Sequence, residues 1–67
     1  MTHEQTLEIV ARYCRNRWAL QSLQNRPYAF MRETRMTLLR AKIKVDEKNY
    51  PRCRFIYAAC YLQVLEQ

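Results

Sequence analysis

Residues 55–65 read FIYAACYLQVL and contain a single polar residue, Gln63. A helix of this composition is apolar around most of its circumference, so it has to be covered on more than one side. We therefore expect the rest of the chain to be organised around this segment. Because 67 residues form only a small core, we also expect help from a second polypeptide.

Two polar breaks, each containing a proline, divide the chain before this segment. The first is Asn25-Arg26-Pro27, where proline pushes the preceding residue out of the α region and is itself favoured at a first helical position. The second is the polar run 46–51. The breaks predict an all-α fold with helices at about 3–24, 27–45 and 51–66.

The first predicted helix has a clear start, because Thr2 and Gln5 have the spacing of a capping box. Short connections favour antiparallel neighbours, so the sequence predicts one small domain, residues 1–67, built as an up-down-up three-helix bundle. A helix-turn-helix is disfavoured, since the helices are long and the chain has no turn glycine.

The predicted helices carry more apolar surface than one small bundle can cover. On the first helix we expect the main apolar stripe to be part of the core; it consists of Leu7, Val10, Ala11, Cys14 and Trp18. A weaker stripe lies opposite and consists of Ile9, Tyr13 and Leu20. The second helix has two stripes as well: Tyr28, Met36, Leu39 and Ile43, and Phe30, Met31, Leu38, Ala41 and Val45. This surplus of apolar surface indicates that the chain self-associates or docks on a partner protein. The alternative is that the second stripe of each helix stays exposed to solvent, since exposed apolar residues are common.

The charge is strongly basic, with 12 Lys and Arg against 6 Asp and Glu, a net charge of +6. Such a charge attracts nucleic acid, anionic membranes or acidic protein surfaces. We expect one basic face to contact an acidic partner or phosphates, unless its members are independent solvated side chains; they are Arg12, Arg15, Arg32, Arg35 and Lys42.

The residue inventory offers little for catalysis. The chain contains no glycine, which excludes a P-loop, a dinucleotide fingerprint and a nucleophile elbow. Its three cysteines and one histidine lack the close spacing of zinc ligands, so we expect no metal, no cofactor and no enzymatic activity. A distant alternative is a redox switch at Cys53, whose arginine neighbours would lower its pKa if it were exposed.

The sequence also bears on the compartment. No run reaches the roughly 18 apolar residues of a membrane span, the first residues lack a secretion signal, and the odd cysteine count fits a reducing compartment. These observations predict a cytoplasmic protein without a membrane partner. Surface binding by the second helix is disfavoured too, because Glu33 lies on its polar side and its apolar residues are split.

Taken together, these patterns predict a non-enzymatic regulatory or inhibitory protein, and no stretch resembles the motif of a known family. The closing helix would supply an apolar anchor made of Tyr57, Cys60, Tyr61 and Val64, and the basic face would steer it onto an acidic patch. The alternative is a nucleic-acid-binding protein, in which a dimer presents the arginines to phosphates.

Overall fold

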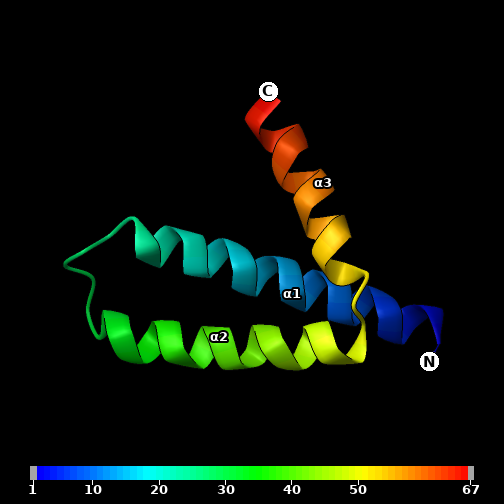
Figure 1. Ribbon diagram of the computed structural model, residues 1–67, viewed down its shortest axis with the longest axis horizontal. Helices are drawn as coiled ribbons and strands as arrows, with labels where there is room; N and C mark the ends of the chain where they lie inside the picture. The colour runs from blue at the N-terminus through cyan, green and yellow to red at the C-terminus, as the bar shows by residue number, and fades with distance from the viewer. Residues whose placement is uncertain (1, 67) are drawn as a thin grey trace.

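The computed structural model describes residues 2–66, which form three helices in the order α1 (His3–Gln24), α2 (Arg32–Asn49) and α3 (Cys53–Glu66). The predicted all-α class is therefore confirmed. α1 and α2 lie side by side as an antiparallel hairpin, and α3 leaves this hairpin at a steep angle, as Figure 1 shows. Because α3 packs chiefly on α1 and does not run alongside α2, the up-down-up arrangement is not confirmed.

The start of α1 agrees with the prediction to the residue. Thr2 Oγ1 accepts a hydrogen bond from the Gln5 backbone N–H at 3.1 Å, and Gln5 Oε1 accepts one from the Thr2 N–H at 3.0 Å. This capping box satisfies two backbone donors that a helix start otherwise leaves unpaired.

The predicted start of the second helix, at Pro27, is wrong, because residues 27–31 form a turn and α2 begins at Arg32. The Ala29 N–H donates to the Arg26 carbonyl, and Met31 adopts the left-handed conformation with φ 49°. A residue in that conformation cannot continue a right-handed helix, so α2 starts after it.

The predicted end of the second helix, at Val45, is wrong as well, since α2 continues to Asn49. The polar run after Val45 was predicted to be a break, yet Asp46 is buried, with 1% of its surface exposed. Its carboxylate accepts two hydrogen bonds from the Arg12 guanidinium, Nε to Oδ2 at 3.1 Å and Nη2 to Oδ1 at 2.6 Å. Pro51 then ends the helix, and α3 begins at Cys53, two residues later than predicted.

The central core is a cluster contributed by all three helices: Tyr13 from α1, Ile43 from α2, and Cys53 and Tyr57 from α3. The Tyr13 hydroxyl donates to Glu47 Oε1 at 2.8 Å, so this large side chain is buried with its polar atom satisfied. Two further residues are buried closer to the hairpin loop, Leu23 near the end of α1 and Met36 near the start of α2.

The expected core stripe of the first helix is only partly right, because Val10 and Cys14 pack against the core cluster but the other members are exposed. Tyr13, from the stripe predicted to be the weaker one, is buried, whereas Leu7 and Trp18 are 54% and 49% exposed. The reason is that the last turn of α2 offers carboxylates to Arg12 and Tyr13, and this polar pairing turns their side of α1 towards α2.

Apolar surface remains uncovered in the described part of the chain, as the composition predicts. On α2 the core side contains Met36 and Ile43, while the opposite stripe, which includes Leu38 and Val45, is more than half exposed. No helix among residues 2–66 is long and apolar enough to cross a membrane.

The Tyr13 phenol gives a pH-dependent contribution to stability. Burial, followed by the hydrogen bond to Glu47, raises the pKa of Tyr13 above its ordinary value. The folded state therefore keeps this proton when the unfolded state, with a pKa of about 10, has lost it. The contribution is complete below about pH 10 and is lost as the pH rises through the folded pKa, by at most about 1.4 kcal/mol per pH unit.

We predict that Tyr13→Phe costs about 1 kcal/mol of unfolding free energy at pH 8, through the lost hydrogen bond. Above pH 10 its stability should fall less steeply than that of the wild type. Urea unfolding followed by circular dichroism at several pH values measures both effects. Tyr28→Phe is the matched control, because Tyr28 is 98% exposed and should keep the wild-type slope. Equal slopes for wild type and Tyr13→Phe would contradict the assignment.

Candidate functional site

Two grooves lie beside α3, one on each side, because α3 stands on α1 without a second helix along its flanks. We call the first the tryptophan groove; it has a volume of about 530 Å³ and is lined by Cys14, Arg15, Trp18, Ala19, Ser22, Tyr57, Cys60, Tyr61 and Val64. We call the second the arginine groove; it has a volume of about 610 Å³ and is lined by Tyr13, Arg17, Gln21, Glu47, Arg54, Phe55, Tyr57, Ala58, Tyr61 and Leu62.

The tryptophan groove contains the whole predicted apolar anchor. Cys60 and Val64 are exposed along it, Tyr61 is half-buried, and Tyr57 is buried at its base. The rings of Trp18 and Tyr61 meet edge to face, with centroids 5.8 Å apart, which joins α1 to α3 across the groove. Sequence reasoning placed Trp18 in the core, so its part in this surface was missed.

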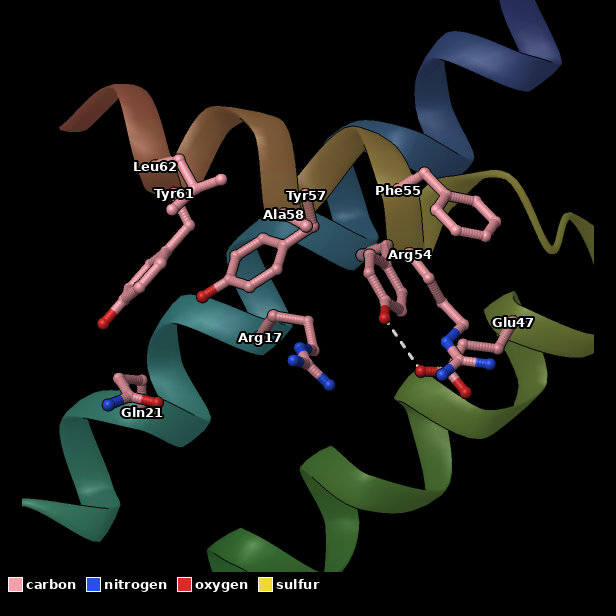
Figure 2. Close-up of a pocket in the computed structure, with 10 residues that line it drawn as sticks. Arg17, Gln21, Glu47, Arg54, Phe55, Tyr57, Ala58, Tyr61 and Leu62 are labelled. Carbon is pink, nitrogen blue, oxygen red and sulfur yellow. Dashed lines mark hydrogen bonds between the residues drawn. The ribbon is translucent and has the colours of Figure 1, made fainter. Parts of the chain in front are cut away.

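The arginine groove is more polar and was not predicted. Its floor is aromatic, and the Arg17 guanidinium lies 4.9 Å from the Tyr57 ring centroid, within the range of a cation–π contact. Arg54 and Phe55 come from the first turn of α3 (Figure 2). The Phe55 side chain is 76% exposed. Arginines and aromatic rings alternate along residues 12–18, which was the available signal, but only the structure shows that Arg17 and Arg54 line one groove.

The predicted basic face is only partly assembled. Arg12, Arg15 and Lys42 line one groove between α1 and α2. Within residues 2–64, whose side chains the structure describes, neither Arg15 nor Lys42 forms an ion pair with an acidic side chain, whereas Arg12 is paired with Asp46, which raises the pKa of its guanidinium.

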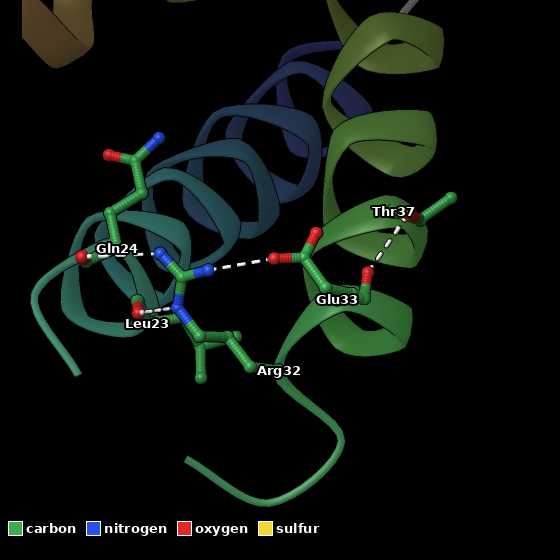
Figure 3. Close-up of polar contacts among 5 residues, drawn as sticks. All are labelled: Leu23, Gln24, Arg32, Glu33 and Thr37. Carbon is green, nitrogen blue, oxygen red and sulfur yellow. Dashed lines mark hydrogen bonds and ion pairs between the residues drawn. The ribbon is translucent and has the colours of Figure 1, made fainter. Parts of the chain in front are cut away.

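The other two predicted basic residues have local structural contacts near the hairpin loop. Arg32 donates from Nε to the Leu23 carbonyl at 3.1 Å and from Nη1 to Glu33 Oε1 at 2.8 Å (Figure 3). Arg35 donates from Nη1 to the Phe30 carbonyl at 3.3 Å. These guanidiniums therefore hold the loop and the end of α1.

The three thiols differ sharply in their surroundings. Cys60 is exposed and Cys14 is half-buried, whereas Cys53 is fully buried and its Sγ lies 3.8 Å from the Asp46 carbonyl. Burial raises the pKa of both Cys14 and Cys53. The redox-switch alternative needs an exposed Cys53 with a lowered pKa. In the structure this thiol is buried and its pKa is raised, so its surroundings do not favour that alternative.

Neither a metal site nor a relative identifies the chain. Among the described side chains, residues 2–64, no group of three or more histidine, cysteine or carboxylate side chains could hold a metal ion. No family model, curated protein or solved structure matches this sequence. The grooves and the charges around them are therefore the features that bear on function.

The thiol surroundings predict an order of modification. With a disulfide reagent at pH 8, Cys60 should react first, Cys14 more slowly, and Cys53 only when the chain unfolds, because a buried thiol with a raised pKa has little thiolate. The absorbance of the released reagent thiol should show a fast phase that corresponds to one cysteine per chain. The variant Cys60→Ser should lack this fast phase. A fast phase that survives in Cys60→Ser would overturn the order.

Proposed function

We propose that this chain is a non-enzymatic interaction protein, regulatory or inhibitory in action, that binds the acidic surface of a partner protein. The observation that supports this most directly is the position of Arg15, which lines both the tryptophan groove and the basic groove that contains Lys42. An apolar surface and unpaired positive charge are thereby continuous. A partner that inserts an apolar side chain beside Trp18 would meet these two cations with its carboxylates.

The composition of the tryptophan groove suits this role. Tryptophan, tyrosine and arginine are the residues that most often dominate the free energy of protein interfaces. Trp18 and Tyr61 provide rigid aromatic surface, and Val64 extends it along α3. A second copy of this chain could cover the same surface, so we include self-association in the proposal. The free thiols suit a reducing compartment, and we propose the cytoplasm as the place of action.

The test needs variants that alter the groove and spare the buried core cluster; because Trp18→Ala also removes the ring contact with Tyr61, it is paired with Val64→Ser, which lies outside that contact. Trp18→Ala and Val64→Ser remove half-exposed apolar side chains, and Leu38→Ser is a matched control because Leu38 is exposed to a similar degree on α2. Each groove variant should weaken binding to the purified partner by about thirtyfold, which corresponds to the roughly 2 kcal/mol of a hot-spot residue. Arg15→Glu should mainly slow association and flatten its salt dependence.

Affinity capture with the wild-type chain, followed by calorimetry with the purified captured protein, provides these measurements, and circular dichroism checks folding. If a second copy covers the groove, sedimentation velocity should show a doubled mass that Val64→Ser returns to a monomer. Wild-type behaviour of both groove variants, or an equal loss in Leu38→Ser, would count against the proposal.

A second candidate function, binding of single-stranded nucleic acid, is favoured by the arginine groove. Single-strand binders combine cations that contact phosphates with rings on which bases stack. Here Arg17 and Arg54 supply the cations, and the exposed Phe55 supplies a ring beside them. The same groove contains Glu47, which lowers its net positive charge, so we place this candidate second.

The candidate predicts two separable effects in fluorescence anisotropy with a labelled oligonucleotide at several salt concentrations. Arg54→Gln should reduce the slope of log affinity against log salt by about 0.7, the value for one phosphate on a single strand. Phe55→Leu should weaken binding about tenfold and leave the slope unchanged, because it removes stacking but no charge. Arg40→Gln, on α2, is the charge control. Absence of binding at low salt would eliminate this candidate.

A further inference from the structure

The loop between α1 and α2 presents three apolar side chains to solvent. We call residues 25–31 the aromatic loop; in it Tyr28 is 98% exposed, Phe30 80% and Met31 54%. Exposed single apolar residues are common, but three within four positions form a patch that calls for a binding role. The loop forms one tip of the helical hairpin, away from α3 (Figure 1).

The loop is held in this conformation by contacts on both sides. Arg32 donates from Nε to the Leu23 carbonyl and from Nη2 to the Gln24 carbonyl, at 3.1 and 3.4 Å (Figure 3). Arg35 donates to the Phe30 carbonyl, and the backbone N–H of Arg35 donates to the Met31 carbonyl at 2.9 Å. The apolar side chains therefore stay outside while several backbone carbonyls are already paired.

This internal pairing matters for the kind of surface that the loop can enter. Backbone polar groups resist transfer out of water unless they are hydrogen-bonded. Pro27 has no N–H to pair, and the Ala29 N–H is satisfied by the Arg26 carbonyl at 3.2 Å. The paired groups can thus leave bulk water at reduced cost, whereas the N–H groups of Tyr28, Phe30 and Met31, which form no hydrogen bond within the described residues, remain hydrated among the lipid headgroups.

The charge around the loop is positive. Glu33 is the only acidic residue in residues 25–35, and its carboxylate is paired with Arg32 at 2.8 Å. Arg26 and Arg35 flank the apolar side chains without forming an ion pair in the described part of the chain. The tip therefore combines aromatic and apolar side chains with two uncompensated guanidiniums.

We propose that the aromatic loop inserts Tyr28, Phe30 and Met31 into the headgroup region of an anionic lipid bilayer, with Arg26 and Arg35 contacting lipid phosphates. Aromatic side chains favour the membrane–water interface, and arginines near an anionic surface are attracted to it. A convex tip can enter a fluid interface, whereas a protein receptor would need a pocket of matching shape. The inference does not rest on the proposed function, since it uses neither groove.

The sequence argument against surface binding depended on a helix from Pro27, which would have split these apolar residues between two stripes. In the structure the three residues share one turn outside α2, and Glu33 is neutralised. Neither the split of the apolar residues nor the charge of Glu33 therefore argues against membrane binding by the loop.

Insertion can be read directly with a fluorescent reporter in the full chain. In a Trp18→Phe background, Phe30→Trp places the only indole in the loop, and Val45→Trp places it on α2 about 20 Å further along at 1.5 Å per residue. Vesicles of phosphatidylcholine with about one-third phosphatidylglycerol are the probe. The loop indole should shift to shorter wavelength with these vesicles, and the indole at position 45 should not.

Co-sedimentation with the same vesicles measures the affinity. Binding should be about thirtyfold tighter to the anionic vesicles than to pure phosphatidylcholine, from two arginines near the surface. Phe30→Ser should weaken it about tenfold or more, while Val45→Ser, which also removes an exposed apolar side chain, should not. Arg26→Gln should cost about fivefold on anionic vesicles only.

Three results would overturn the proposal. The first is the absence of a wavelength shift for the loop indole, and the second is an equal loss for Phe30→Ser and Val45→Ser. The third is binding that depends on charge alone, with full affinity in Phe30→Ser. A loop that binds a protein pocket would give the first of these results.

Discussion

The ion pair between the buried Asp46 carboxylate and the Arg12 guanidinium is the interaction on which the rest of the structure depends. The two carboxylate oxygens accept both hydrogen bonds from Arg12, and the Asp46 backbone carbonyl lies 3.8 Å from Cys53 Sγ. One turn of α2 thereby contacts α1 through a side chain and the start of α3 through the backbone. A buried carboxylate is costly without its cation, so this pairing specifies how α1 lies against α2. In the same turn of α2, the Glu47 carboxylate accepts a hydrogen bond from the Tyr13 hydroxyl of α1.

This arrangement explains which parts of the fold could be predicted. The limits of α1, its capping box and the number of helices follow from local signals, namely periodicity, cap residues and prolines. Asp46 and Glu47 were interpreted as part of a polar break, because local signals cannot show that a charged pair will find partners thirty-four residues away. The same pairing decides that Tyr13 is buried, so the error about Trp18 has the same origin.

The sequence predicts that the chain has an apolar surface and a basic surface, but not which basic side chains are free to form the second. The four residues of the apolar anchor lie in one groove because they share a helix, which sequence spacing does show. The basic residues come from different helices, and only the structure separates those with structural contacts from those that are unpaired. Arg12 and Arg32 satisfy acidic side chains, and Arg35 satisfies a loop carbonyl. A guanidinium has five donors and suits backbone carbonyls as well as carboxylates and phosphates, so residue type alone could not make this distinction.

The small core links folding to binding. The buried apolar residues in the described chain are few, and large side chains such as Phe55, Leu62 and Val64 remain more than half exposed along α3. Because α3 packs chiefly on one neighbour, its hold on the hairpin depends on the core cluster around Tyr57 and on the edge-to-face contact between Trp18 and Tyr61. A molecule that fills either groove adds contacts that only the folded chain can make, so its binding free energy also stabilises the fold, by about 2.7 kcal/mol at a hundred times its Kd. In so small a domain that is a large share of the total stability, and the angle of α3 is therefore the feature that a ligand in either groove would fix most strongly.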